Sequence, residues 1–222
     1  MKKLTFVIIA ASQVLLLTGS YAANTTLTWG ALENSIGDAS NNPLPTGDIV
    51  LAGTFQGLTP SQVAADAAAV SAGTFSGGAA AFENDFTTFA TTTMAGANVG
   101  NTPGFFSAVS SNSASTLGIV GDEIYYFVFN NSTQSAATQY GIFTAPANSM
   151  WAFPNDTTIP QAIITDVGDV PQNSSGILWG SFNNTASQYD LAQIQAIPEP
   201  STFALGGMGA LGLLIAARRK RK

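Results

Sequence analysis

IYYFVF, residues 124–129, is an unbroken run of six large apolar side chains in a sequence whose other stretches are rich in Ala, Gly, Ser, Thr and Asn. Successive side chains of a β-strand point to opposite faces of the sheet. A strand without polar alternation is therefore typical of the middle of a sheet that is covered on both faces. We predict that residues 124–129 form a central strand, following a turn at Gly121-Asp122.

Shorter stretches on either side of this run also have the pattern of strands. In Thr25–Ala31 and Asp48–Phe55, large apolar side chains recur at every second position, which is the period of a half-buried strand. Several short strands separated by turn residues predict a mainly β fold, either a β-sandwich or a jelly-roll-like domain. The further strands that we expect are 139–144, 161–165, 176–182 and 189–196.

One helix has clear start and stop signals. Thr59 can cap its N-terminus, Pro60 suits the first helical position, and Gln62 completes a capping box. The alanine-rich run Ala64–Ala69 favours propagation, and Gly73 is a typical terminator. The sequence therefore predicts a helix between residues 60 and 72.

A second helix is predicted at Ala79–Phe89, because Phe82, Phe86 and Phe89 fall at positions i, i+4 and i+7. Residues 91–116 are rich in Gly, Ser, Asn and Thr, and we expect them to form a long surface connection.

The distribution of charge excludes many kinds of chemistry. All seven Lys and Arg residues are Lys2, Lys3 and the five residues 218–222, and the chain has no His and no Cys. Residues 23–196 thus contain twelve acidic side chains and no basic one, which excludes nucleic acid as an electrostatic partner. Catalytic triads, Cys–His pairs, Ser–Lys dyads and His-ligated zinc are excluded as well. Without disulfides, the stability must come from a packed core.

Carboxylates are the remaining chemical groups. Asp166 and Asp169 flank Val167-Gly168 with a spacing that suits two ligands of a calcium ion, so this loop is a candidate metal site. We expect no other cofactor. Glu83 with Asp85 and Asp122 with Glu123 are expected to be solvated. The three Trp residues stand in apolar contexts, so we expect them to be buried in the core rather than to stack on sugars.

The first 22 residues have the three parts of a secretory signal peptide. Lys2 and Lys3 form the positive region, Leu4–Leu17 is the apolar region, and Ser20-Tyr21-Ala22 supplies small residues before the cleavage point. We predict cleavage between Ala22 and Ala23, after passage through the secretion translocon.

The last 26 residues also have three parts in a fixed order. Pro198-Glu199-Pro200 comes first, and Thr202–Ala217 is an uncharged apolar run that we predict to be a transmembrane helix. The basic residues that follow would hold the end of the chain on the cytoplasmic side of the inner membrane. They are Arg218, Arg219, Lys220, Arg221 and Lys222.

This tail, about an eighth of the chain, resembles the PEP-CTERM sorting signal of Gram-negative bacteria. The resemblance rests on the Pro-Glu-Pro triplet, the Gly- and Leu-rich span and the terminal basic cluster. It implies recognition by an exosortase, a membrane-embedded transpeptidase-like enzyme, with processing near the triplet. It also implies an association with extracellular polysaccharide and biofilm.

These observations divide the chain into a signal peptide (1–22), an acidic β-rich exported domain (23–196) and a sorting signal (197–222). We expect the exported domain to have a structural or adhesive role in the cell envelope or extracellular matrix, linked to exopolysaccharide, and not to be an enzyme. The alternative is a secreted carbohydrate- or calcium-binding module. A carboxylate-dependent glycosidase is a distant third.

Overall fold

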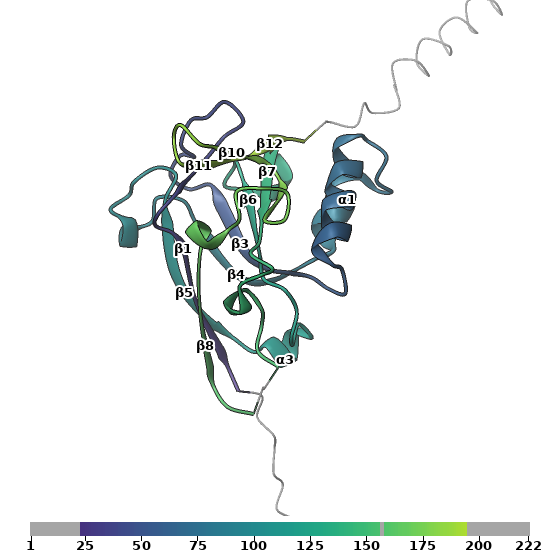
Figure 1. The fold of residues 1–222 in the computed structure, drawn as a ribbon, viewed down its shortest axis with the longest axis vertical. Helices are drawn as coiled ribbons and strands as arrows, with labels where there is room; N and C mark the ends of the chain where they lie inside the picture. Colours follow the sequence, from purple (N-terminus) through teal and green to yellow (C-terminus); the bar gives the residue numbers. More distant parts are fainter. Residues whose placement is uncertain (1–22, 156–157, 195–222) are drawn as a thin grey trace, which may run out of the picture.

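The structure is a computed structural model that describes residues 23–155 and 158–194 (Figure 1). Its α-helices are α1 (Pro60–Ser71), α2 (Gly78–Asn84) and α3 (Ala114–Leu117). Its 3-10 helices include η1 (Ala97–Val99), η3 (Ser149–Trp151) and η4 (Val167–Asp169). The strands are β1 (Thr25–Ala31), β2 (Ser35–Gly37), β3 (Ile49–Phe55), β4 (Phe86–Thr93), β5 (Phe106–Asn112), β6 (Tyr125–Phe129), β7 (Gln139–Phe143), β8 (Gln161–Asp166), β9 (Ile177–Trp179), β10 (Ser181–Asn183), β11 (Gln188–Asp190) and β12 (Ala192–Gln193).

The largest sheet is built around β6. Its strands follow the order β12-β7-β6-β3-β4, with β9 also paired to β7, and all these neighbours are antiparallel. Every residue of β6 is buried. The prediction of a central strand buried on both faces is therefore confirmed.

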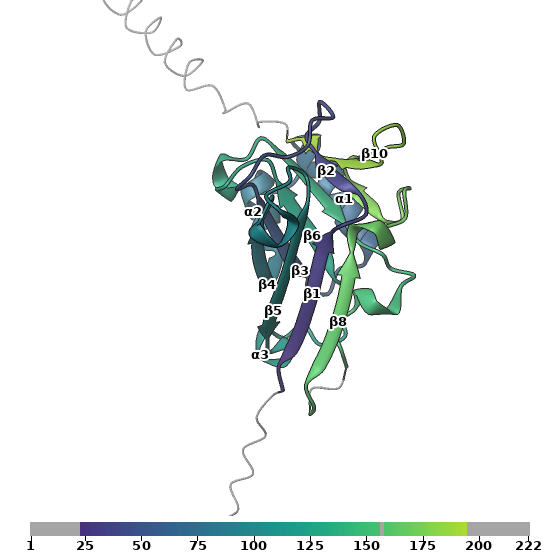
Figure 2. The same cartoon turned by 90° about the vertical axis from the view of Figure 1, so that its left-hand side faces the viewer.

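A second, three-stranded sheet with the order β5-β1-β8 covers one face of the large sheet (Figure 2). The two sheets meet through aromatic rings. The ring of Trp29 on β1 lies 5.5 Å from that of Tyr126 on β6, and Tyr126 also contacts Trp151 at 4.6 Å. The hydroxyl of Tyr126 forms a hydrogen bond of 2.6 Å with the hydroxyl of Thr165 on β8. This buried bond connects the two sheets through the core.

The helices α1 and α2 cover the opposite face of the large sheet, where α1 stands beside the sheet in Figure 1. A second core forms there, because alternate residues of β6 point to opposite sides. Phe127 packs in this core against Phe55, with ring centroids 5.8 Å apart, and against Tyr140 at 5.2 Å. The result is three layers: a small sheet, a large sheet and a pair of helices.

The predicted fold class is therefore confirmed as mainly β with a few short helices. The sheets do not close into a barrel, and a third small sheet, β10-β11-β2, lies at the upper end of the molecule in Figure 1. No helix within the described ranges is long and apolar enough to cross a membrane. The transmembrane helix predicted at 202–217 lies outside the described residues.

The helix α1 matches its sequence signals. The Thr59 side chain accepts a hydrogen bond from the backbone N–H of Gln62, and the Gln62 side chain accepts one from the N–H of Thr59 at 2.9 Å. This capping box is the one that the sequence predicts. After the helix, Gly73 adopts a left-handed conformation with φ of 67°, which a side chain would disfavour.

The second predicted helix is wrong in its second half. The helix α2 ends at Asn84, and Phe86 begins the strand β4. Phe86 packs under the helices, whereas Phe89 points into the core between the two sheets. The spacing of Phe86 and Phe89 resembles a helical period, but these side chains lie on opposite faces of a strand. The two cores that they fill, and not the local pattern, decide the structure of this segment.

The long surface connection predicted at residues 91–116 is also wrong. This segment contains the end of β4, the turn η1 and all of β5, which pairs with β1 over seven residues from Ala31↔Phe106 to Thr25↔Asn112. One side of β5 faces solvent and carries Ser107, Val109 and Ser111, while Ser110 and Asn112 stand on the other side with Phe106 and Ala108. These polar residues conceal the apolar alternation by which a strand is recognised in a sequence.

Candidate functional site

The folded domain extends almost to the predicted sorting signal. The strand β12 pairs with the edge of β7, and the N–H of Ile194 donates a hydrogen bond of 2.8 Å to the carbonyl of Thr138. Pro198 follows only four residues later. Four extended residues reach about 13 Å, so a processing enzyme acting at the triplet would work next to the folded domain.

The residues predicted for sorting and export lie outside the described residues. They are Pro198, Glu199, Pro200, the basic residues Arg218–Lys222 and the signal cleavage position Ala22. Strand β1 begins at Thr25, so cleavage between Ala22 and Ala23 would leave the first strand intact.

The two candidate calcium ligands lie at the two ends of η4, because Asp166 ends β8 and Asp169 is the last residue of η4. Asp166 Oδ1 accepts a hydrogen bond of 2.8 Å from the N–H of Gly168, and Asp166 Oδ2 accepts one of 3.0 Å from the N–H of Leu32. Asp169 Oδ2 accepts hydrogen bonds from Trp151 Nε1 at 3.2 Å and from the N–H of Asp166 at 3.3 Å. These carboxylates therefore hold the turn and fasten it to its neighbours.

Burial raises the pKa of Asp166, and the nearby carboxylate of Glu33 raises it further. No group of three or more His, Cys, Asp or Glu side chains suited to a metal ion occurs within residues 23–155 and 158–194. Calcium binding at Asp166 and Asp169 remains a prediction, and backbone carbonyls or water would have to supply most of the six to eight oxygen ligands.

The other acidic residues named from the sequence are spread over the domain. Glu123 Oε1 accepts a hydrogen bond of 2.6 Å from the hydroxyl of Thr144, and burial raises the pKa of Glu123 and that of Glu83. Glu83, Asp122 and Glu123 are half-buried rather than fully solvated as expected, whereas Asp85 is exposed. Trp29 and Trp151 are fully buried, which confirms their predicted place in the core, whereas Trp179 is only partly buried against the core under the helices.

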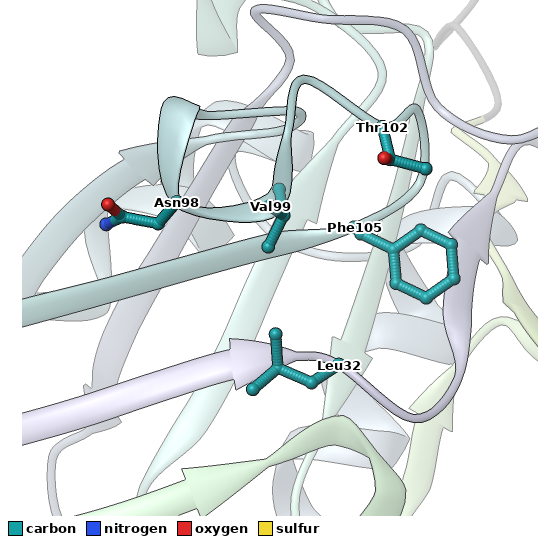
Figure 3. A pocket seen from close by; sticks show the side chains of 5 residues that line it. All are labelled: Leu32, Asn98, Val99, Thr102 and Phe105. Atoms are coloured by element: carbon teal, nitrogen blue, oxygen red, sulfur yellow. The ribbon is translucent and has the colours of Figure 1, made fainter.

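A hollow that no sequence motif indicates lies where β1 and β5 meet the turn η1 (Figure 3). It has a volume of about 330 Å³ and is lined by three apolar side chains, Leu32, Val99 and Phe105, together with Asn98 and Thr102. Leu32 and Val99 point toward one another across it in Figure 3. This lining combines apolar surface with an amide and a hydroxyl, and it carries no charge.

The backbone around this hollow has an unusual conformation. Ala95 and Asn101 have positive φ values of 56°, a region that residues with a side chain rarely adopt. Gly104 also has a positive φ, and a Cβ atom there would lie 2.8 Å from the carbonyl oxygen of Ile36. Such conformations persist only where the surrounding structure enforces them, and they concentrate at functional sites.

Leu32, which lines the hollow, follows the outward face of β1. On that face Thr28 is paired with Val109 on one side and with Ile164 on the other. Val109 is 65% exposed and Ile164 is 64% exposed. Gly30 lies between this row and Leu32, and a Cβ atom there would lie 3.4 Å from Leu32 Cγ and 3.6 Å from Asp166 Oδ2. Gly30 is paired with Ser107 and Asp166, so this face presents hydroxyl and aliphatic groups with one carboxylate beside them.

Comparison with known proteins assigns the end of the chain but not the folded domain. The family model described as the PEP-CTERM protein-sorting motif matches residues 196–222. Searches of curated proteins and of solved structures found no match. The chain therefore carries a PEP-CTERM protein-sorting motif. This motif marks it as an exported protein that is anchored transiently in the membrane, is processed by an exosortase-type enzyme and reaches the cell surface or the extracellular space.

Proposed function

We propose that the domain of residues 23–196 is a non-catalytic structural or adhesive component of the cell envelope or extracellular matrix, associated with exopolysaccharide. The observation that carries this proposal is the absence of Lys, Arg, His and Cys from these residues. Nucleophilic catalysis and phosphoryl or acyl transfer depend on such side chains for activation or for stabilisation of charge. A fold of 174 residues without them suits a surface component better than an enzyme.

The distribution of carboxylates supports the same proposal. A glycosidase needs two carboxyl groups about 5–10 Å apart on either side of a sugar-sized cleft. The hollow of Figure 3 is lined by uncharged residues, and a second one beside α1, of about 340 Å³, is lined by Pro, Ser, Ala and Leu residues only. Carboxylate pairs such as Asp122 and Glu123 belong to neither lining.

We expect the purified protein to hydrolyse none of a panel of neutral and acidic polysaccharides. Reducing ends released over a day should not exceed those of a heat-denatured sample. Asp122→Asn and Glu123→Gln serve as matched variants, because each keeps the shape of its side chain. Hydrolysis by the unchanged protein that either substitution abolishes would overturn the proposal in favour of a carboxylate-dependent glycosidase.

The sorting motif provides a second prediction, on localisation. Glu199→Ala should block processing while leaving membrane insertion intact, because the apolar run and the basic residues are unchanged. Removal of residues 218–222 should instead impair the orientation of the anchor, because the positive charges on the cytoplasmic side are lost. Fractionation and the mass of the protein would distinguish the two variants. Normal processing of the Glu199→Ala variant would show that the processing enzyme does not recognise the triplet Pro198-Glu199-Pro200.

A further inference from the structure

We propose that the hollow lined by Leu32, Asn98, Val99, Thr102 and Phe105 is a binding site for an uncharged glycan (Figure 3). This inference rests on the proposed function, because it names the site through which the domain would hold exopolysaccharide. The argument uses the size of the hollow, the chemistry of its lining and the charge around it.

The size of the hollow suits a small ligand unit. Its volume of about 330 Å³ lies at the lower end of the range of roughly 300–1,000 Å³ that is typical of small-molecule sites. The hollow is open to solvent rather than enclosed, so a ligand can extend beyond it. A single sugar ring within a longer chain meets both conditions.

The lining suits the two surfaces of a sugar ring. A pyranose has an apolar face of C–H groups and a rim of hydroxyls that donate and accept hydrogen bonds. Phe105 is half-buried and Leu32 is 59% exposed, so both offer apolar surface to the C–H face. Thr102 carries a hydroxyl and Asn98 an amide, which together can both donate and accept.

The polar group of Asn98 is already oriented by the protein. Its Nδ2 donates a hydrogen bond of 3.2 Å to the carbonyl of Ser107 at the start of β5. This bond leaves Oδ1 and the second N–H free to bind a ligand. The left-handed residues Ala95 and Asn101 shape the loop that carries Asn98 and Thr102, so the geometry of the site is fixed by the backbone.

The charge of the domain selects against ionic ligands. Residues 23–196 contain twelve carboxylates and no basic side chain, so uronic acids, sulfated sugars and phosphorylated sugars would be repelled. The lining itself carries no carboxylate, and the nearest one that the structure places beside it, that of Asp166, already accepts hydrogen bonds from the N–H groups of Leu32 and Gly168. An uncharged glycan is the ligand that fits a neutral, amphipathic hollow on an acidic protein.

The neighbouring sheet face provides space for the rest of the glycan chain. Leu32 lies close to Gly30, where a Cβ atom would lie 3.4 Å from Leu32 Cγ and 3.6 Å from Asp166 Oδ2, an oxygen that can accept a hydrogen bond from a sugar hydroxyl. Beyond Gly30 lies the row of Val109, Thr28 and Ile164, whose side chains are aliphatic or carry a hydroxyl. Successive sugar units could therefore lie along this face from the hollow.

Binding is tested with the full chain in a detergent without a sugar head group, on immobilised neutral hexose oligosaccharides of several linkages and on alginate oligosaccharides. We expect binding to a neutral glycan only, with Phe105→Ala and Thr102→Val each weakening it about tenfold. Thr102→Val keeps the shape of an exposed side chain, so its result does not depend on Phe105→Ala folding normally. Circular dichroism and the unfolding temperature check both variants.

Val120→Ala is the matched control. Val120 is an exposed aliphatic residue that follows α3, next to the Asn112 end of β5, whereas the hollow lies at the Phe106 end. This substitution should leave glycan binding unchanged. A well-folded Phe105→Ala or Thr102→Val variant that binds the neutral glycan like the unchanged protein would overturn the inference.

Equal binding of alginate, or no binding of any neutral glycan, would also overturn the inference. So would a dimer of the unchanged protein that the Phe105→Ala substitution dissociates, because a second copy of the chain would then be the occupant of the hollow. The two proposals fail separately. If the exopolysaccharide of cells that make the Phe105→Ala variant retains as much of the protein as that of normal cells, the hollow is not the glycan site, although the matrix role stands. Hydrolysis of the panel would instead refute the matrix role.

Discussion

Replacing Phe127 with alanine should lower the free energy of unfolding by about 3–5 kcal/mol, as is typical for the loss of a buried aromatic ring. Phe127 is completely buried at the centre of the large sheet, and its ring contacts those of Phe86 at 5.4 Å and Phe129 at 4.4 Å. The second core, under α1 and α2, is built around this ring. Because total stabilities are usually about 5–15 kcal/mol, the variant should be strongly destabilised.

Urea denaturation followed by circular dichroism measures this change. Val109→Ala is the control, because Val109 is 65% exposed on the outer face of the small sheet and should change the free energy of unfolding by less than about 0.5 kcal/mol. If Phe127→Ala cost no more than Val109→Ala, the helical layer would not pack on the large sheet as described.

The second large effect concerns Asp48, whose replacement by asparagine should stabilise the protein at neutral pH. Asp48 is only 6% exposed, and its Oδ2 atom has no hydrogen-bond partner within the part of the chain that the structure describes. Burial of the charged form raises the pKa of Asp48 from 3.8 to about 6. Keeping this carboxylate ionised in the folded state therefore costs free energy.

The sign of the pH dependence follows from this pKa. The folded state binds the Asp48 proton more tightly than the unfolded state does, so the free energy of unfolding should fall as the pH rises from about 4 to about 6. At pH 7 the full cost applies, which is roughly 1–3 kcal/mol. Asp48→Asn should recover most of it and raise the melting temperature by several degrees.

The measurement is thermal unfolding of both proteins between pH 4 and pH 8. Half-buried carboxylates, including Glu83 and Glu123, also have raised pKa values and act in the same direction, so the difference between Asp48→Asn and the unchanged protein isolates Asp48. Asp85→Asn serves as the control, since Asp85 is exposed and its substitution should have little effect. A difference that does not grow between pH 4 and pH 7 would contradict the buried, unpaired state of Asp48.

The parts of the fold that the sequence predicts well are those encoded by neighbouring residues. The strand β6 follows from six consecutive apolar side chains, and α1 follows from Thr59, Pro60 and Gln62, which act within one turn of helix. Phe86 and Phe89 mislead because a strand with a core on each side also needs apolar residues three positions apart. Local spacing alone cannot distinguish these two environments.

The hollow could not be predicted, because its lining comes from segments that only the fold brings together. Leu32 lies after β1, whereas Val99 and Phe105 belong to the loop before β5, and the pairing of β1 with β5 places them side by side. None of these residues belongs to a recognisable motif. The sorting signal is the opposite case, since its parts are contiguous and a family model recognises them without a structure.

The central claim, that the chain is an exported protein sorted through its C-terminal motif, is tested most directly by the mass and location of the mature protein in the cells that make it. We expect a surface or extracellular form that begins at Ala23 and has lost the apolar run and the basic residues 218–222. Intact mass spectrometry of the fractionated cells measures both ends at once. A protein that retains residues 202–222 and remains in the inner membrane would contradict the account.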